Sequence, residues 1–460
     1  MSAITPQLLA RYDVPGPRYT SYPTADRFVE AFTEADYLQA LEHRRDTRSL
    51  KGQPLSLYVH IPFCESLCYY CACNKIITKH HERAKVYLAY LRREVALHTA
   101  LLGKGHSVSQ LHLGGGTPTF LSDEELTELL DMLRSAFSFV PGGEYSIEVD
   151  PRTVTTQRLQ TLHALGFNRL SFGVQDFEPA VQKAVHRIQP AEQVFALTDD
   201  ARRIGFESVN VDLIYGLPQQ TAQSFARTMA LVNQLRPDRI ALYAYAHLPE
   251  RFKPQRRIHI EQLPAAGDKV AMLSQAMTAL MSAGYVYVGM DHFALPDDAL
   301  AVAKRQGRLH RNFQGYSTQP DCDLIALGVS SIGRVGATYS QNAKTLEEYC
   351  DLIDQGRFPV VRGLALSRDD IARRAIIMAL MCQGQVLFES IELAHLLQFK
   401  TSFAAELEAL KGLQTQGLVT LDDTGIQVTP QGWFFVRAVA MVFDRYLQAD
   451  RNRARFSKII

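Results

Sequence analysis

The chain contains the stretch Cys64-Glu65-Ser66-Leu67-Cys68-Tyr69-Tyr70-Cys71-Ala72-Cys73, which holds four of its seven cysteines in a C-x3-C-x2-C-x-C spacing. Thiolates are soft ligands, so this crowding favours an iron–sulfur cluster, zinc or copper(I). Three cysteines can hold a four-iron cluster and leave the fourth iron without a protein ligand, open to a small molecule. The alternative is a structural zinc site made by all four cysteines, although such sites usually join two separated pairs.

The bulk composition limits the class of protein. A chain of 460 residues predicts two or three domains, and 47% hydrophobic residues allow a large core. The formal charge of +1 argues against a nucleic-acid or membrane-surface partner. The sequence shows no signal peptide and no apolar run near the ~18–20 residues that span a bilayer. An odd number of cysteines does not predict a disulfide framework, so we expect a cytoplasmic protein.

From about residue 55, short β-rich runs alternate with longer amphipathic runs. The longer runs have helical spacing, for example at residues 84–101, 123–137, 193–204 and 221–235. Such alternation predicts an α/β fold with a parallel sheet and helices outside it. Six units are too few for a closed eight-fold barrel, so we expect a partial (β/α)6 barrel of the TIM type. The predicted strands are residues 56–63, 110–113, 144–149, 169–174, 208–214 and 239–244.

Conspicuous residues follow the ends of these predicted strands. Sites in parallel sheets form at the carboxyl ends of the strands, so these residues should converge. They are the cysteine stretch, Gly114-Gly115-Gly116-Thr117-Pro118, Glu148 and Asp150, Gln175 and Asp176, Asp212, and Tyr245-Ala246-His247.

We divide the chain into three parts. Residues 1–38 are an N-terminal arm, in which residues 16–24 hold two prolines, a glycine and two tyrosines and favour an extended or turning path. Residues 39–330 form the barrel. Residues 331–460 form a mostly helical C-terminal domain, with a predicted strand–turn–strand over residues 413–430 that is typical of winged helices.

The cysteine spacing and Gly114-Gly115-Gly116-Thr117-Pro118 resemble the radical S-adenosylmethionine (SAM) enzymes. Cys73, the arm and His310-Arg311-Asn312-Phe313-Gln314-Gly315-Tyr316 narrow the resemblance to the oxygen-independent coproporphyrinogen III oxidases. The resemblance runs from about Tyr12 to the C-terminus.

The resemblance implies site residues, named here by their matching positions. It implies a [4Fe-4S] cluster held by Cys64, Cys68 and Cys71. It also implies two catalytic residues, Glu148 and the non-ligand thiol of Cys73, which would position a group or donate a proton. It also implies two molecules of SAM. The contacts implied for the first SAM are Tyr58, Gly115, Glu148 and Ile332, and those for the second are Tyr70, Gly116, Thr117, Gln175, Arg187, Asp212 and Ala246.

The activity that the resemblance implies is oxidative decarboxylation without oxygen. A SAM-derived 5′-deoxyadenosyl radical would take hydrogen from two propionates of coproporphyrinogen III, which become the vinyl groups of protoporphyrinogen IX. The expected partners are this substrate and an electron donor such as a flavodoxin or ferredoxin. We expect a monomer without nucleic acid or a membrane span.

The four propionates of the substrate carry negative charge, so the site needs cations to bind them. Two basic runs are candidates for this role. We expect at least one to border the cavity, the alternative being solvated faces. Arg18 and Tyr22 are candidate substrate contacts, unless the arm simply packs on the body. The two runs are Arg251, Lys253, Arg256 and Arg257, and Lys304, Arg305, Arg308 and Arg311.

Two other functions fit parts of the sequence. A haem-binding chaperone of the same superfamily would keep the cluster without decarboxylation, although Cys73 and the arm favour the oxidases. A transcription factor would use a zinc-bound cysteine loop and the winged-helix tail, although the balanced charge argues against it.

Overall fold

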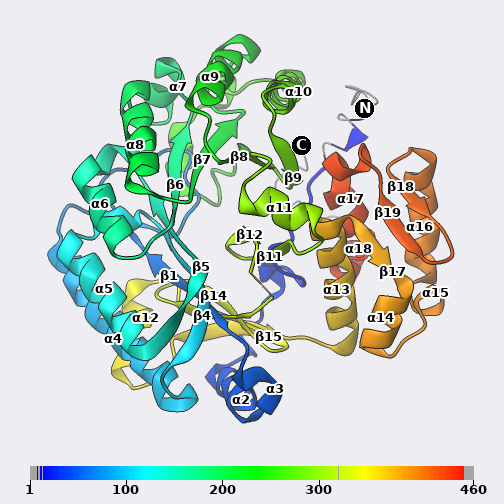
Figure 1. Ribbon diagram of the computed structural model, residues 1–460, viewed down its shortest axis with the longest axis horizontal. Coiled ribbons are helices and arrows are strands. Elements are labelled where there is room, and N and C mark those ends of the chain that lie inside the picture. Colours follow the sequence, from blue (N-terminus) through cyan, green and yellow to red (C-terminus); the bar gives the residue numbers. More distant parts are fainter. Residues whose placement is uncertain (1–7, 9–10, 13, 320, 450–460) are drawn as a thin grey trace.

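The computed structural model describes residues 8, 11–12, 14–319 and 321–449. The first residues of the expected arm and the last residues of the expected C-terminal domain lie outside them. Figure 1 shows a curved sheet wrapped by helices, with a smaller helical unit beside it. The sheet has twelve strands in the order β16-β15-β14-β13-β1-β4-β5-β6-β7-β8-β10-β9.

The middle of this sheet is parallel, and it contains the six predicted strands in the predicted order. Each strand pairs in parallel with the next, from β1 through to β8. A further parallel strand, β13 (Asp323–Leu327), pairs with the other side of β1. The six are β1 (Leu55–Ile61), β4 (His106–Gly115), β5 (Phe137–Val149), β6 (Arg169–Gln175), β7 (Ser208–Tyr215) and β8 (Arg239–Ala244).

Helices cover the outside of the curved sheet, as the alternation predicted (Figure 1). Their starts follow local sequence. Helix α5, for example, begins after Ser122, which accepts from the Glu125 amide while Glu125 accepts from the Ser122 amide. Among these helices are α4 (Glu82–Leu102), α5 (Asp123–Ala136), α6 (Thr156–Ala164), α7 (Pro179–Ala184), α8 (Ala191–Ile204), α9 (Ala222–Leu235) and α10 (Ala266–Ser282).

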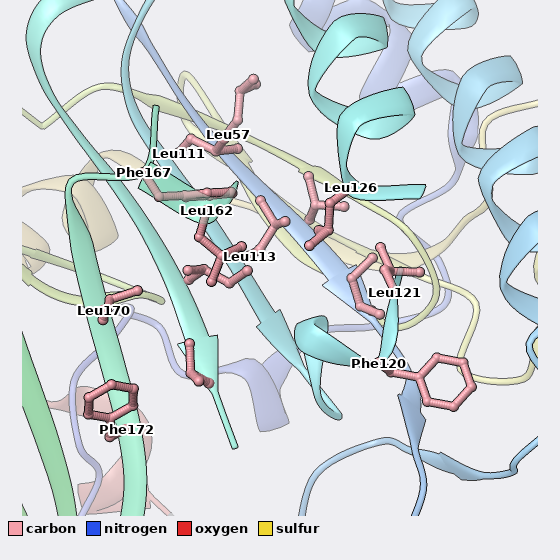
Figure 2. Packing of buried hydrophobic residues seen from close by; sticks show 14 of the residues in the cluster. Leu57, Leu111, Leu113, Phe120, Leu121, Leu126, Leu162, Phe167, Leu170 and Phe172 are labelled. Atoms are coloured by element: carbon pink, nitrogen blue, oxygen red, sulfur yellow. The ribbon is translucent and has the colours of Figure 1, made fainter. Parts of the chain in front are cut away.

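The core lies between the sheet and these helices. Leu57, Leu111 and Leu113 of β1 and β4 are completely buried, as are Leu126 of α5 and Leu162 of α6. Figure 2 shows these side chains packed together. Burying each of these side chains stabilises the fold by about 1.5–3 kcal/mol. This stabilisation offsets the cost of the polar groups that line the inner side of the barrel.

The sheet does not stop at residue 330, where we expected the C-terminal domain to begin. Antiparallel strands extend it beyond β13 on one edge, and β10 (His292–Ala294) and β9 (Val286–Gly289) extend it beyond β8. We therefore propose a boundary near residue 366 instead of 331. The strands beyond β13 are β14 (Ile332–Val335), β15 (Thr338–Asn342) and β16 (Val360–Ala365).

The helical unit follows this boundary. Strand β19 (Gly425–Val428) lies between β17 (Gln385–Leu387) and β18 (Val419–Leu421) in a small antiparallel sheet. The predicted strand–turn–strand is therefore present, but its first strand begins six residues later than residue 413, because α16 continues to Thr415. The helices are α13 (Arg368–Gln383), α14 (Phe388–His395), α15 (Phe399–Ser402), α16 (Ala404–Thr415), α17 (Val436–Met441) and α18 (Arg445–Ala449), and α12 (Leu346–Asp354) precedes the boundary.

The described part of the arm packs on the body. Tyr19 and Tyr22 are 1% and 0% exposed, and the Tyr19 hydroxyl donates to Asp444 at 3.0 Å. Tyr22 thus lies in the core of the helical unit and does not face a cavity. Helix α2 (Glu34–Asp46) begins four residues before the expected end of the arm. In the described residues, no helix is both long and apolar enough to cross a membrane.

Candidate active site

The cysteine loop begins at the carboxyl end of β1. Its start is tied down by β2 (Phe63–Cys64), which pairs with β3 (Ile76–Ile77). Cys64 and Cys68 are buried, Cys71 is half-buried and Cys73 is exposed. The four thiols therefore lie in one loop at the mouth of the barrel, as the spacing predicted.

The glycine segment after β4 docks against this loop. The amide of Gly116 donates to the carbonyl of Ile61 at 2.8 Å, and that of Thr117 donates to Phe63 at 2.9 Å. A Cβ atom on Gly116 would lie 2.7 Å from the carbonyl oxygen of Pro62. Gly115 has φ +114°, and a Cβ there would lie 2.6 Å from the His60 ring. Glycine is required at Gly116 because two backbones approach closely there, and at Gly115 because its φ is positive and the His60 ring lies against it.

Three side chains point hydrogen-bond donors at the cysteine sulfurs. The Thr117 hydroxyl lies 3.3 Å from Cys64 Sγ. Arg187 Nη1 and Arg152 Nη2 lie 3.5 and 3.7 Å from Cys68 Sγ. Such donors favour thiolates, the form that binds metal.

The thiols themselves differ in their readiness to ionise. Burial raises the pKa of Cys64 to about 11. A hydrogen bond from Cys73 and the nearby Lys75 ammonium lower the pKa of Cys71 to about 6, against its burial. Coordination would have to deprotonate Cys64, whereas Cys71 is already poised as a thiolate near neutral pH.

A cavity of about 450 Å³ lies beside the loop. Most of the predicted site residues line it, although they come from five different strand ends. Among the described residues, Tyr58, Ala246 and Ile332 are not in its wall. The predicted residues that line it are Cys64, Cys68, Tyr70, Cys71, Cys73, Gly115, Gly116, Thr117, Glu148, Gln175, Arg187 and Asp212.

Two carboxylates face this cavity from neighbouring parts of the sheet. Glu148 is 44% exposed and accepts the Gly115 amide at 3.1 Å, with His112 Nε2 at 3.5 Å. Asp212 accepts from Ser171 at 3.1 Å and from Asn210 at 2.9 Å. Burial first, then the charge of Glu148, raises the pKa of Asp212 to about 6. Both can accept hydrogen bonds from ammonium or ribose hydroxyl groups.

Arg187, a predicted contact of the second SAM, lines the cavity but already has protein partners. It is 7% exposed, pairs with Asp150 at 3.1 Å, and donates to the Gly173 carbonyl at 2.6 Å. Arg152 pairs with the same Asp150 at 2.6 Å. Although burial opposes it, the two arginines lower the pKa of Asp150. Arg187 therefore holds the cavity wall and the Cys68 sulfur together, and a ligand carboxylate would have to share it.

Sequence reasoning missed several residues of this wall. Arg152, Ser171 and Gly173 line the cavity, and the signal available was their position at or just after a predicted strand. Asp176, by contrast, was grouped with the site but is 1% exposed. It accepts from Thr228 at 2.6 Å and from Gln220 at 2.5 Å, so it supports the loop behind the wall.

A second cavity of about 260 Å³ lies on the inner side of the sheet and shares Glu148, Ser171 and Asp212 with the first. Its wall also includes Gln314 of the stretch 310–316, whose side chain donates to the Leu57 carbonyl at 3.1 Å. Phe313 instead packs edge-on against Tyr339. The two cavities together lead from the cysteine loop into the barrel.

Three predicted contacts, Tyr58, Ile332 and Ala246, lie outside the lining of the first cavity. Tyr58 stacks on His112, with ring centroids 5.9 Å apart, and His112 lines the second cavity. Ile332 begins β14, opposite Gln341. Ala246 follows β8, next to Tyr245, whose amide donates to Tyr215 at 2.8 Å.

The basic runs do not line either cavity within the described residues, contrary to our expectation. Arg311 is instead 5% exposed and donates to the Arg18 carbonyl at 3.2 Å, and Lys304 is half-buried over the Trp433 ring. Arg18 is nearer the interior, because it pairs with Asp291 at 3.0 Å and lies 4.9 Å from the ring of Tyr243, which lines the second cavity.

The donor set fits a cluster better than a single ion. Across the described residues, no three His, Cys, Asp or Glu side chains converge to hold one metal ion. A cluster binds each thiolate at a different iron, so its cysteines need not meet at one point. Cys64, Cys68 and Cys71 would hold such a cluster on the cavity side of the loop.

The class of protein follows from this fold and loop. A family model described as the radical SAM superfamily matches residues 58–232. A second, described as the HemN C-terminal domain, matches residues 366–435, which begins at the boundary that the sheet suggested.

The particular family follows from full-length relatives. The chain is 50% identical over 455 residues to the oxygen-independent coproporphyrinogen III oxidase of Pseudomonas aeruginosa, covering 98% of each chain. It is 48% identical to the Escherichia coli protein of the same name, again over 98% of each chain. The solved structure of E. coli coproporphyrinogen III oxidase (HemN), described as a radical SAM enzyme, superposes with a TM-score of 0.91 at 47% identity, covering 97% of this chain and 100% of that one. The chain belongs to the oxygen-independent coproporphyrinogen III oxidase family.

Proposed function

We propose that the two joined cavities catalyse the oxidative decarboxylation of two propionates of coproporphyrinogen III, giving protoporphyrinogen IX without oxygen. Each propionate loses carbon dioxide, one hydrogen atom and one electron, which passes to an external acceptor. The observation that carries this proposal is the convergence of three cysteines, a glycine cradle and two carboxylates on one cavity, in a chain that belongs to this family.

When bound, the cluster and SAM supply a carbon radical that can take hydrogen from an unactivated position. The chain's own residues have simpler tasks. Cys64, Cys68 and Cys71 would hold the cluster, while Thr117 and Arg187 donate to their sulfurs. Burial of this loop against the glycine segment would keep water and oxygen away.

We propose that two molecules of SAM bind, as in the two residue sets drawn from the resemblance. The first would contact Tyr58, Gly115, Glu148 and Ile332. Of these, Glu148 lines the cavity and already accepts a hydrogen bond from the Gly115 amide. The second would contact Tyr70, Gly116, Thr117, Gln175, Arg187 and Asp212, which line the same cavity, and Ala246, which is not in its lining. Gln175 is held at φ +70°, a strained conformation that often marks a functional position. Cys73, exposed beside Cys71, would donate a proton or position a ligand.

The test is an anaerobic assay with the reconstituted protein, SAM, dithionite and coproporphyrinogen III. We expect protoporphyrinogen IX, together with methionine and 5′-deoxyadenosine. Iron and sulfide counts near four each should accompany activity. Stoichiometric zinc without sulfide, or SAM cleavage without vinyl formation, would refute the proposal, and the second result would favour a haem-binding relative.

A further inference from the structure

A short basic helix is attached to the outer side of the cysteine loop. The helix η4 (Lys253–Arg257) presents Gln255, 1% exposed, whose side chain donates to the Tyr70 carbonyl at 3.0 Å. Arg257 donates to the Tyr69 hydroxyl at 3.2 Å, and its guanidinium lies 5.1 Å from the centre of that ring. The helix is therefore bound to the loop between Cys68 and Cys71.

The segment after α7 holds the same part of the loop from another side. The Tyr69 amide donates to the Val185 carbonyl at 3.0 Å. The His186 ring stacks on Tyr69, with centroids 5.1 Å apart and planes 8° apart, and its Nδ1 lies 2.8 Å from the Leu67 carbonyl oxygen. Tyr69 thus contacts both His186 and Arg257, and this half of the loop is rigidly supported where it reaches the surface.

We call Arg251, Lys253, Arg256 and Arg257 the basic collar. All four are exposed. Within the part of the chain that the structure describes, none of them forms an ion pair with a carboxylate. Arg256 donates to the Pro249 carbonyl at 3.0 Å, and Arg251 lies 5.7 Å from the Phe252 ring. Residues 250–261 carry these four cations against two carboxylates, Glu250 and Glu261, so the segment has a positive excess.

Two large apolar side chains are exposed in the same two segments. Ile188, directly after the Arg187 that contacts Cys68, is 66% exposed. Ile260, three residues after Arg257, is 70% exposed. Unpaired cations with isolated apolar side chains fit a transient interface, in which charge steers the encounter and apolar contacts complete it.

The collar lines neither cavity, so the substrate propionates have no access to it from the sites described above. The electron that the reaction consumes has to enter from outside, and electron transfer weakens steeply with distance. A donor must therefore dock close to the cysteine loop. The collar lies at such a place, because Gln255 and Arg257 contact the two residues between Cys68 and Cys71.

We propose that the basic collar is the docking surface for an acidic one-electron carrier protein that holds a flavin or an iron–sulfur centre. This inference rests on the proposed function. At each encounter the carrier loses one electron and the enzyme gains it, and no bond is made or broken between the proteins. Complementary charge would speed association and make it sensitive to salt.

The test uses the triple variant Arg251→Glu/Lys253→Glu/Arg256→Glu, which leaves Gln255 and Arg257 on the loop. The matched control, Arg308→Glu/Lys400→Glu/Lys411→Glu, changes net charge equally at exposed positions elsewhere. Calorimetry at low salt with an oxidised, FMN-bearing bacterial flavodoxin should show binding about tenfold or more weaker for the collar variant than for the control. Binding by the parent should weaken as salt rises, and the variant should lose most of this dependence.

Activity then separates this inference from the proposed function. Turnover driven by reduced flavodoxin should fall about tenfold in the collar variant, while turnover driven by dithionite stays unchanged. Unchanged flavodoxin affinity would overturn the inference. A raised KM for coproporphyrinogen III under dithionite would also overturn it, since the collar would then be a substrate anchor. No turnover with either reductant in the parent would defeat the proposed function, but the binding comparison would still stand. If the triple variant unfolds, the milder Arg251→Gln/Arg256→Gln variant gives the same comparison.

Discussion

The mouth of the barrel and the C-terminal domain use their buried space in opposite ways. Around the cysteine loop, glycines and polar side chains border a cavity, and backbones touch where any Cβ would collide. In the C-terminal domain, aromatic rings fill the interior. Phe399 packs against Phe388 and Phe403 with ring centroids 4.3 and 4.9 Å apart.

This difference separates two kinds of constraint. A well-packed apolar core stabilises a domain and tolerates surface change, whereas a ligand site keeps polar groups and open space at a cost in stability. Changes at the mouth should therefore abolish function while the fold survives. Changes in the C-terminal domain or at its contact with the barrel should alter stability while activity survives.

The largest effect is expected from Cys68→Ser. A serine hydroxyl is a poor ligand for iron, so the cluster should be lost and activity should fall below about one thousandth of the parent. Iron and sulfide counts and the anaerobic assay measure this. The temperature of unfolding of the metal-free protein should stay close to that of the parent, because the loop is held by backbone contacts. Full activity in this variant would contradict the conclusion that the mouth of the barrel carries the function.

A smaller effect is expected from Gly116→Ala. The added methyl would lie 2.7 Å from the Pro62 carbonyl oxygen, so the glycine segment must move away from the cysteine loop. A displacement of this kind can cost about 100-fold in activity. The control is Gly412→Ala in α16, where nothing lies within 4 Å of the added Cβ.

In that control, alanine should raise stability by about 0.5–1 kcal/mol, because glycine is unfavourable inside a helix, and leave activity unchanged. Steady-state kinetics and denaturant unfolding of the two variants measure the contrast. Equal effects on activity at both glycines would contradict the division between site and scaffold.

The smallest effect is expected at the contact between the two regions. Lys304 of α11 (Ala299–Arg305) lies 4.1 Å over the Trp433 ring and donates to the Tyr287 carbonyl at 2.6 Å. Burial lowers its pKa from 10.5 to about 7. Between pH 7 and 10.5 the unfolded chain therefore binds more protons than the folded chain, so the stability of the fold should rise with pH across this window.

Lys304→Met removes this dependence. Below about pH 7 the folded parent has to bury the charged ammonium, so the variant should be more stable by about 1 kcal/mol. The gain is no larger because the stacking of the ammonium on Trp433 offsets part of the cost of burying it. The advantage should shrink as pH approaches 10. Unfolding in denaturant at several pH values tests this, and activity should not change. A parent whose stability is flat from pH 7 to 10 would show that Lys304 stays charged in the fold.

Local pattern predicted much of this molecule. The six parallel strands, the helices between them and the cysteine loop at the strand ends follow from periodicity and from residue types that act over a few positions. Distant pairing was not predictable in this way. Strand β13 joins β1 across more than 250 residues, and β14 to β16 extend the sheet beyond residue 330, because sheet edges are completed by whichever segment folds back onto them.

The amino-acid sequence by itself determined the chemistry available here, namely three clustered thiols, a glycine run and acids at strand ends. Each of these features could be predicted because ligand type and strand position are local properties of the sequence. The tertiary structure alone decided which groups are free to use that chemistry. It placed Arg187 on Asp150 and Cys68, buried Tyr22 in the core of the C-terminal domain, and set the basic collar outside the cavity against the cysteine loop. The reason is physical, since the partner that satisfies a charge or covers a ring comes from packing of segments far apart in the chain.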